Sequence, residues 1–375
     1  MIFAFLVPII TCLILFLFFR KETVWFEYFI VFVPSILGTL LSYYIIGKTM
    51  AIDYKYISEP AVKIRHYDKW NEWVHRTCTR TIRVGKTTRT QTYDCSYCKT
   101  HPEKWAMIDK KGNEYWISED VFNYYRNLWG TKEIFINCHR SYYTIDGDAQ
   151  DYMWNNKPEH ILVDTRKELY KNYFQTAPNL YNIEDLTSQE LKDNYLIEKD
   201  KIKYFIGNKI KTGNYLEILG YKVTDNQVRK QHYLNSRDKN FRTIFLFFDN
   251  KNPSIAEKHA QYWKRGEENE VVFCFGIKND TVTWIRSFSW SEEPWLESEF
   301  KSTILPGKRV NIDQYQDLID KLYLEGKWRP KDFKSFSYIS PVLTTGGNLG
   351  VIFITLLINI LISIWVIDNE IRKEE

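Results

Sequence analysis

The stretch LGVIFITLLINILISIWVI, residues 349–367, has no charged side chain at any position. Two further apolar runs stand at the start of the chain: residues 2–19 carry no charge, and residues 25–46 carry only Glu27. A bilayer core of about 30 Å needs about 20 apolar residues as a helix. The sequence therefore predicts three membrane-spanning helices, two in an N-terminal hairpin (residues 1–47) and one before a short tail (residues 368–375).

The first run could instead be a secretory signal peptide or a helix buried in a soluble core. It lacks the basic leading segment and the small-residue cleavage site of a signal peptide. Pro8 and Pro34 are compatible with spans, because membrane helices tolerate proline where neighbouring groups satisfy the backbone. We therefore expect an integral, multi-pass membrane protein.

Basic residues near the spans bear on the side of the membrane. Arg20 and Lys21 occupy the short loop between the first two runs, and Arg372 and Lys373 lie in the tail. Short basic loops favour the cytoplasm, whereas long segments cross the membrane largely regardless of charge. The pattern favours a domain outside the cytoplasm, although lysines and arginines also flank the domain.

The polar region between the spans is long enough for one large or two small cores. We divide it into a β-rich part that contains most of the cysteines (residues 48–181), a polar connector (residues 182–240) and an α/β part (residues 241–335). The chain has 51 basic and 47 acidic residues and a net charge of +4. This balance argues against a nucleic-acid partner.

The α/β part has the clearest periodicity. Apolar runs predict strands over residues 243–248, 270–276 and 282–290, with a helix from Ser254 to Gly266 after the first. The order strand–helix–strand–strand predicts an α/β sandwich in which the helix crosses one face of the sheet. The overall class is therefore an α+β membrane protein.

Further elements are predicted outside this core. Amphipathic spacing predicts helices over residues 119–129, 165–176 and 312–324. Two Thr- and Arg-rich runs around Gly85 predict a β-hairpin that brings Cys78 toward Cys95. The alternating arginines and threonines of the hairpin indicate a solvated face, with lipid-headgroup binding as the alternative.

The strongest chemical signal is Cys78 with Cys95, Cys98 and His101. A C-x₂-C pair with two further Cys or His ligands is typical of structural zinc, and His75 or Cys138 could replace an outer ligand. In an oxidising compartment Cys78, Cys95, Cys98 and Cys138 would instead form two disulfides, and free thiols are the third alternative. None of these alternatives implies catalysis.

Two other residues invite a catalytic interpretation. Asp249 follows a buried strand, where α/β proteins often place a functional carboxylate, but Asp249-Asn250 also fits a simple turn. His259 falls on an apolar helix face and is expected to be a satisfied core residue. No Walker or G-x-G-x-x-G pattern is present.

Four segments match a known family in order and spacing. They are residues 94–98 with His101-Pro102 and Trp105, residues 170–173 with Ala177-Pro178, residues 240–290 and residues 329–333. Together they resemble a family of uncharacterised membrane proteins from tailed phages and some bacteria, with terminal spans and a Cys/His-rich segment. That family's segment carries more cysteines and histidines than this chain. The resemblance implies no activity.

Residues 240–290 are also similar in pattern to the TPM domain, a membrane-tethered module. TPM proteins typically have a Gly-Asn-Gly-like turn where this chain has Glu267-Glu268-Asn269-Glu270. Some members of that family are phosphatases and others are assembly or repair factors. The resemblance implies either activity and assigns no catalytic residue.

We expect a non-enzymatic membrane protein whose domain binds or remodels a partner at the membrane surface, such as a phage-encoded envelope factor. The expected partners are the lipid bilayer and another membrane or envelope protein. Asn359 within the last span could bond a neighbouring helix, which leaves a homo-oligomer open. The alternative is a TPM-like hydrolase, a phosphatase that uses Asp249.

Overall fold

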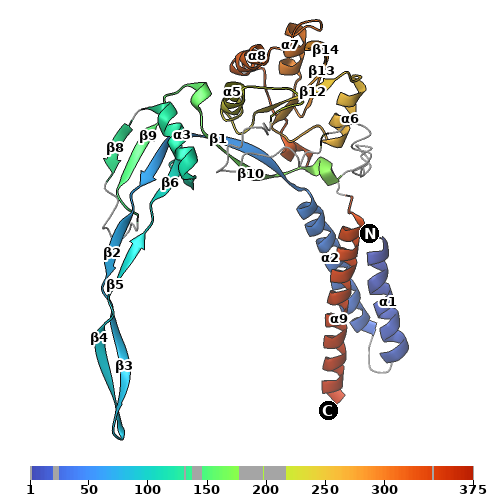
Figure 1. Cartoon of the computed structure of the whole chain (residues 1–375). Coiled ribbons are helices and arrows are strands. Elements are labelled where there is room, and N and C mark those ends of the chain that lie inside the picture. The colour runs from blue at the N-terminus through green and yellow to red at the C-terminus, as the bar shows by residue number, and fades with distance from the viewer. Residues whose placement is uncertain are drawn as a thin grey trace.

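The computed structural model describes residues 2–19, 25–130, 132–136, 146–176, 197, 217–339 and 342–374. Figure 1 shows a helix bundle, a β-rich part that carries a long arm, and an α/β unit. The chain is therefore of mixed α and β class. Its most apolar helices lie near the two ends of the chain.

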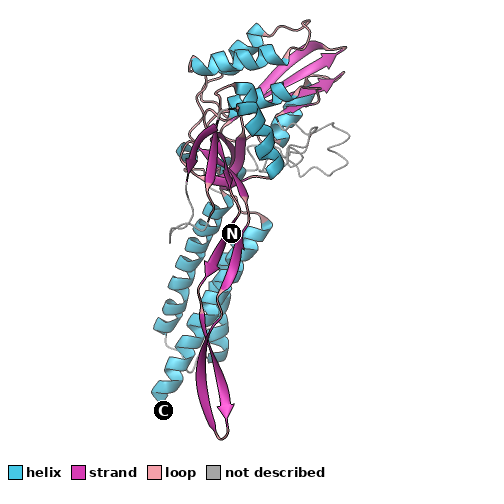
Figure 2. Cartoon of the chain, turned by 60° about the vertical axis from the view of Figure 1, so that its left-hand side comes forward, coloured by secondary structure: helices cyan, strands magenta, loops and turns pink. Residues whose placement is uncertain are grey.

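The bundle consists of α1 (Ile2–Phe19), α2 (Trp25–Met50) and α9 (Thr345–Glu374). The three helices run side by side away from the rest of the molecule (Figures 1 and 2). Two helices, α2 and the Thr345–Asp368 part of α9, are long and apolar enough to cross a membrane, and the apolar stretch of α1 is shorter. Only 22% of the apolar window of each long helix is buried, which is unlike a core helix of a soluble protein.

The β-rich part is a mainly antiparallel sheet built around one long strand, β1 (Ile52–Tyr67). The first half of β1 pairs with β10, and its second half pairs with β6 and β9. Helix α3 covers the sheet, with Ser118 as its N-cap and Gly130 in the left-handed conformation at its end. The other elements are β6 (Lys104–Asp109), β7 (Glu114–Trp116), α3 (Glu119–Trp129), β8 (Lys132–Ile136), β9 (Ala149–Met153), η1 (Pro158–His160) and β10 (Val163–Lys171).

The helix predicted over residues 165–176 is wrong. Most of this segment belongs to β10, which pairs with β1 from Ile52↔Lys171 to Pro60↔Val163, and a short 3₁₀ turn, η2 (Tyr173–Thr176), follows it. Thr165 faces Ser58 in this ladder, and their hydroxyls are 2.9 Å apart. Cross-strand pairing therefore overrides the local helical spacing.

Four strands form the arm, which we define as residues 70–101. Two ribbons follow one another: a proximal ribbon of β2 (Trp70–Val74) and β5 (Tyr97–His101), and a distal ribbon of β3 (Thr77–Val84) and β4 (Thr87–Asp94). The distal ribbon turns at Gly85, whose φ of 64° suits glycine. The predicted hairpin is therefore confirmed, and it extends far from the β-rich part (Figure 1).

The α/β unit has a four-stranded sheet in the order β11–β12–β13–β14. The first three strands are parallel and β14 is antiparallel to β13. Phenylalanines of β12 and β13 pack against α5, α7 and α8 on one face, and α6 covers the other face. The elements are β11 (Ile218–Leu219), α5 (Asp225–Asn235), β12 (Arg242–Asp249), α6 (Ser254–Tyr262), β13 (Glu270–Lys278), β14 (Thr281–Ser289), α7 (Trp295–Thr303) and α8 (Ile312–Leu324).

The predicted order strand–helix–strand–strand is confirmed by β12, α6, β13 and β14. The structure also adds β11 and α5 to this unit. Both fall in the segment expected to be a connector, where the sequence predicts one short strand over residues 215–223 that includes β11. The capping box of Thr224 and Gln227 starts α5. Gln231 and Asn235 of α5 donate to the Thr243 carbonyl oxygen, both at 3.0 Å, and so fix α5 against β12.

Polar contacts join the α/β unit to the β1–β10 ribbon. Lys55 Nζ lies 2.5 Å from Glu268 Oε1, and the Tyr170 hydroxyl donates to Glu267 Oε2 at 2.8 Å. Asn269 donates to the Tyr56 carbonyl oxygen at 3.0 Å. Burial, followed by the charges of Glu267 and Asp53, raises the pKa of Tyr170, so this hydroxyl stays protonated and donates. These contacts attach the α/β unit to the strand that leaves the bundle.

Candidate functional site

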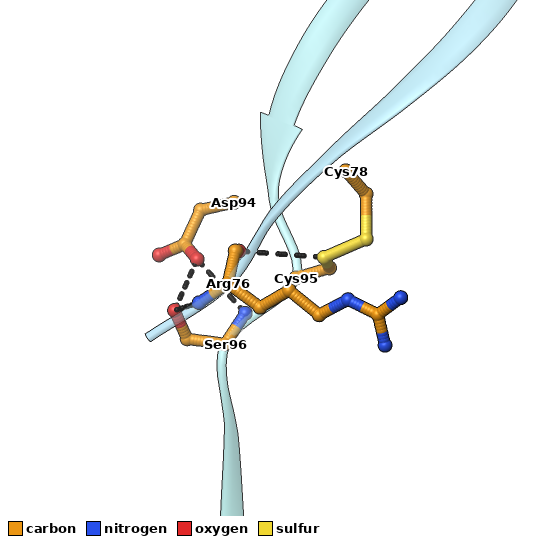
Figure 3. Close-up of a disulfide and its surroundings, with 5 residues drawn as sticks. All are labelled: Arg76, Cys78, Asp94, Cys95 and Ser96. Carbon is orange, nitrogen blue, oxygen red and sulfur yellow. Dashed lines mark hydrogen bonds between the residues drawn. A yellow bond between two sulfur atoms is a disulfide. The ribbon is translucent and has the colours of Figure 1, made fainter. Parts of the chain in front are cut away.

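Cys78 and Cys95 form a disulfide, with their Cα atoms 5.8 Å apart (Figure 3). Disulfide sulfur lacks the thiolate charge that zinc requires, and the described residues contain no group of three His, Cys, Asp or Glu side chains that could hold a metal ion. The predicted zinc site of Cys78, Cys95, Cys98 and His101 is therefore corrected. The pair of cysteines is a covalent crosslink between the two strands of the arm.

Cys98 and His101 fail to converge because both lie on β5. Residues three apart on a strand point to opposite faces and are about 10 Å apart. Cys98 is exposed opposite Trp73, whereas His101 is buried, stacks on Trp70 at 4.7 Å and lies 2.7 Å from Glu72 Oε2. His101 therefore helps to build the base of the arm.

The two alternative ligands have different outcomes. His75 lies at the break between the ribbons beside Trp73 and is exposed. Cys138 lies outside the described residues. One of the two disulfides in the oxidised alternative, Cys78–Cys95, is present, whereas Cys98 is a free thiol, so the second disulfide is not formed.

The disulfide lies at the junction of the two ribbons. Here the Cys95 N–H donates to the Arg76 carbonyl oxygen at 2.9 Å. The Ser96 hydroxyl accepts from the Arg76 N–H at 3.1 Å (Figure 3). Ser96 also donates to Asp94 through its hydroxyl and its N–H, which lowers the pKa of that carboxyl below its usual range. The junction therefore depends on a compact set of polar contacts and the crosslink.

The distal ribbon has two chemically different faces. Pairs such as Thr79↔Thr92 and Thr81↔Thr90 line one face. The other face holds Ile82↔Arg89 and the pair Arg80↔Gln91, in which the Arg80 guanidinium donates to Gln91 Oε1 at 3.0 Å. Every residue of β4 is exposed, so neither face of this ribbon covers a core.

The carboxyl edge of the parallel strands is the candidate site of a hydrolase. Asp249 ends β12 and is exposed. Asn250 follows with a φ of 51°, and Trp284 Nε1 donates to the Lys251 carbonyl oxygen at 2.7 Å. These features form a fixed turn. Asp280, at the neighbouring turn, is engaged by Tyr221 and by Arg309.

His259 is a satisfied core residue, as predicted. Its Nδ1 donates to the Ile255 carbonyl oxygen at 3.0 Å, and its Nε2 accepts from the Ile197 N–H at 3.0 Å. Trp263 donates to the Ile197 carbonyl oxygen at 2.9 Å, so the two side chains hold both backbone groups of that residue. Burial lowers the pKa of His259 to about 4, which keeps the ring neutral.

The bundle contains a polar seam between α2 and α9, most of which was not predicted from the sequence. Ser35 Oγ of α2 donates to Asn359 Oδ1 of α9 at 2.9 Å, and the Thr39 and Thr355 hydroxyls are 3.1 Å apart. All four side chains are buried. The signal was present, because Ser35 and Thr39 lie four residues apart on one face of an apolar helix. The prediction that Asn359 bonds a neighbouring helix is confirmed, and that helix is α2 of the same chain.

No protein family, curated protein or solved structure matches the chain. The resemblances to the phage-borne membrane proteins and to the TPM domain therefore stay predictions.

Proposed function

We propose that this chain is an integral membrane protein that holds its arm outside the cytoplasm to bind a partner at the membrane surface. In this proposal α1, α2 and α9 all span the bilayer, the β-rich sheet carries the arm, and the α/β unit is a sandwich attached to the β1–β10 ribbon. The observation that carries the proposal is the arm itself, a crosslinked ribbon that extends away from every core of the molecule (Figure 1).

The inverted polarity of the bundle supports the three spans. Its outward side chains are large and apolar, whereas its buried positions include Ser35, Thr39 and Asn359. Trp25, 78% exposed, and Tyr44, 60% exposed, stand at the two ends of the apolar part of α2. They are about 28 Å apart along the helix, which matches a hydrocarbon core bounded by aromatic residues.

Two independent features support a domain outside the cytoplasm. Helix α1 ends, and α2 begins, at the end of the bundle far from the domain, where α9 also ends (Figure 1). The basic residues Arg20, Lys21, Arg372 and Lys373 belong to these segments, and basic residues favour the cytoplasmic side. The Cys78–Cys95 disulfide favours an oxidising compartment for the arm.

The exposed aromatic residues of the proximal ribbon support a protein partner. Trp73 of β2 is 58% exposed and Tyr97 of β5 is 47% exposed. Trp73 pairs with Cys98 and Tyr97 with Val74, so each face of the proximal ribbon carries one exposed aromatic ring. Large aromatic side chains are enriched where proteins bind one another. We propose another membrane or envelope protein as the partner, and a phage-encoded envelope factor fits this role.

The arrangement at the carboxyl edge gives less support to the TPM-like phosphatase. A metal-assisted phosphatase needs several ligands that converge on one ion, and Asp249 lies on an exposed turn. We expect the purified protein and its Asp249→Ala variant to give equal phosphatase activity. Activity lost only in the variant would favour the hydrolase.

Photo-cross-linking in intact cells tests the binding role. A benzophenone amino acid replaces Trp73 in the full-length chain, and the matched control replaces Leu324 of α8, which is 70% exposed on the α/β unit. We expect a single protein adduct of defined mass from position 73 and none from position 324. The same adducts from both positions, or none from position 73, would overturn the proposal.

A further inference from the structure

The arm accounts for the net positive charge of this chain. Residues 70–101 contain six Lys or Arg and two Asp or Glu residues, a net charge of +4 that equals the net charge of the whole chain. The remainder of the chain is therefore neutral overall. Four of the basic residues, Arg80, Arg83, Lys86 and Arg89, lie in the distal ribbon and its turn, and all four are exposed.

These four cations are not neutralised by carboxylates in the described part of the chain. Arg80 donates to the neutral Gln91 side chain and lies over the Tyr93 ring at 5.6 Å. Arg83, Lys86 and Arg89 have no ion pair among the described residues. The ribbon therefore presents a positive surface that an external anion can approach.

The arm and the bundle extend from the same side of the domain. Both views show the arm running alongside the helices, with its tip near the level of the end of α9 (Figures 1 and 2). The arm from Trp70 to Val84 is about 45 Å long at the rise of a β-strand. If α2 and α9 span a bilayer, the arm in this conformation lies beside them at the depth of that same bilayer.

The distal ribbon cannot enter the hydrocarbon. A two-stranded ribbon leaves the backbone groups of its outer edges unpaired, and each such group in hydrocarbon costs several kcal/mol. Its guanidinium and ammonium groups add a further penalty. The arm must therefore bend away from the spans, so that the ribbon lies in the headgroup layer or in the water beside it.

The arm has joints that allow it to lie along the surface. The strands are interrupted at the same level on both sides, at residues 68–69 and 102–103 and again at residues 75–76 and 95–96. An interruption on both strands lets a ribbon bend without breaking its ladder elsewhere. The Cys78–Cys95 crosslink keeps the distal ribbon paired beyond the outer joint.

We propose that the distal ribbon docks on the anionic phospholipid headgroups of the bilayer in which the protein is anchored. This inference rests on the membrane anchoring in the proposed function and names lipid as a second partner of the arm. Guanidinium groups bind phosphate oxygens through paired hydrogen bonds. Arg80 and Arg89 lie on one face of the distal ribbon and Arg83 on the other, so both faces offer a guanidinium group to the headgroups. Docking the basic tip would present the aromatic proximal ribbon along the membrane.

The test uses the full-length protein in nanodiscs. A benzophenone amino acid at Ile82 reports lipid contact as a lipid adduct detected by mass spectrometry. We compare discs of phosphatidylcholine alone with discs that contain phosphatidylglycerol. Each basic residue near an anionic surface strengthens binding about fivefold, so we expect adducts in the anionic discs and at least a tenfold loss in phosphatidylcholine or at high salt.

A charge-matched pair of variants makes the test specific. The first replaces Arg80, Arg83, Lys86 and Arg89 with Gln. The control replaces the same number of lysines on the α/β unit with Gln, at Lys278, Lys301, Lys308 and Lys321. We expect the first variant to lose the lipid adduct and the control variant to keep it.

Equal adducts in both kinds of disc, or equal loss in both variants, would overturn the lipid inference. Competition by inorganic phosphate at low concentration would also overturn it, by indicating a site for the free ion. A protein that inserts into the discs but gives no lipid adduct would overturn the lipid inference and leave the membrane anchoring of the proposed function intact. Failure to insert at all would instead overturn the proposed function.

Discussion

The sheet of the α/β unit and the ribbons of the arm are made from strands of similar length but opposite burial. In β13 all residues except the last are buried, and in β4 all residues are exposed. The sequences differ accordingly, because VVFCFGI is a continuous apolar run and TTRTQTYD is polar with one aromatic residue. The sheet of the α/β unit is stabilised by its buried core, whereas the distal ribbon of the arm depends on its backbone hydrogen bonds and one disulfide.

This difference implies that the α/β unit determines folding stability, whereas the arm determines which partners the protein contacts. A change in the α/β core should unfold that unit, whereas a change in the arm should leave the folded body intact and alter what the arm touches. The predictions below test this separation, from the largest expected effect to the smallest.

The first prediction compares one residue from each region. Phe273 of β13 is fully buried, and its ring lies 4.1 Å from that of Phe300. We expect Phe273→Ala to lower the free energy of unfolding of the α/β unit by about 3–5 kcal/mol, because it leaves a cavity. Ile82→Ala, at an exposed position of the arm, should change it by less than about 0.5 kcal/mol. Urea denaturation of the full-length protein measures both, and a similar effect of the two substitutions would contradict the separation.

The second prediction concerns His259, which is neutral in the core with a pKa of about 4. Since the unfolded ring has a pKa near 6.5, the stability it contributes is complete above about pH 6.5 and is lost as the pH falls toward 4. The loss should reach about 3 kcal/mol in the free energy of unfolding between pH 7.5 and pH 4. Urea denaturation across this range measures it, and the His259→Gln variant should lack this part of the pH dependence. The same change in the free energy of unfolding with pH in the variant would show that other groups cause the pH dependence.

The third prediction removes the crosslink of the arm. Replacing both Cys78 and Cys95 with Ser should lower the free energy of opening of the distal ribbon by about 2–3 kcal/mol, because the disulfide restricts the opened chain. Hydrogen exchange measured by mass spectrometry should become faster in β3 and β4 and should stay unchanged in β12 and β13. Faster exchange throughout the α/β unit would contradict a local role.

The fourth prediction tests the seam of the bundle. Single substitutions Ser35→Ala and Asn359→Ala and the double variant form a cycle around the 2.9 Å hydrogen bond. Such bonds in membrane helices contribute about 0.6 kcal/mol on average, so we expect a coupling energy of this size in mixed-micelle unfolding. A coupling energy of zero would indicate that the two side chains do not interact.

Strong local signals made part of the structure predictable. The apolar runs of β12 and β13, the Ser118 cap of α3 and the turn at Gly85 each favour one local structure, and the structure has those elements. The segment over residues 165–176 was mispredicted because its partner, β1, is more than a hundred residues away in the sequence. Helical spacing in a short segment carries no information on such pairing.

The candidate site was less predictable for a similar reason. The predicted hairpin brought Cys78 toward Cys95, but cysteine spacing did not decide between zinc and disulfides. In the structure Cys78 lies opposite Tyr93, and Cys95 follows β4 directly, which brings the two sulfur atoms together. The strand that separates Cys98 from His101 could not be distinguished from a chelating loop by spacing alone. The pairing of Ser35 with Asn359 likewise depends on how two distant helices align.

The central claim is that the arm is displayed outside the cytoplasm by a membrane-spanning bundle. The most direct test is the redox state of Cys78 and Cys95 in intact cells, quenched with acid, alkylated under denaturing conditions and analysed by mass spectrometry. The account predicts a crosslinked pair of peptides, with neither cysteine alkylated. Recovery of both cysteines as alkylated, reduced peptides would place the arm in a reducing compartment and contradict the account.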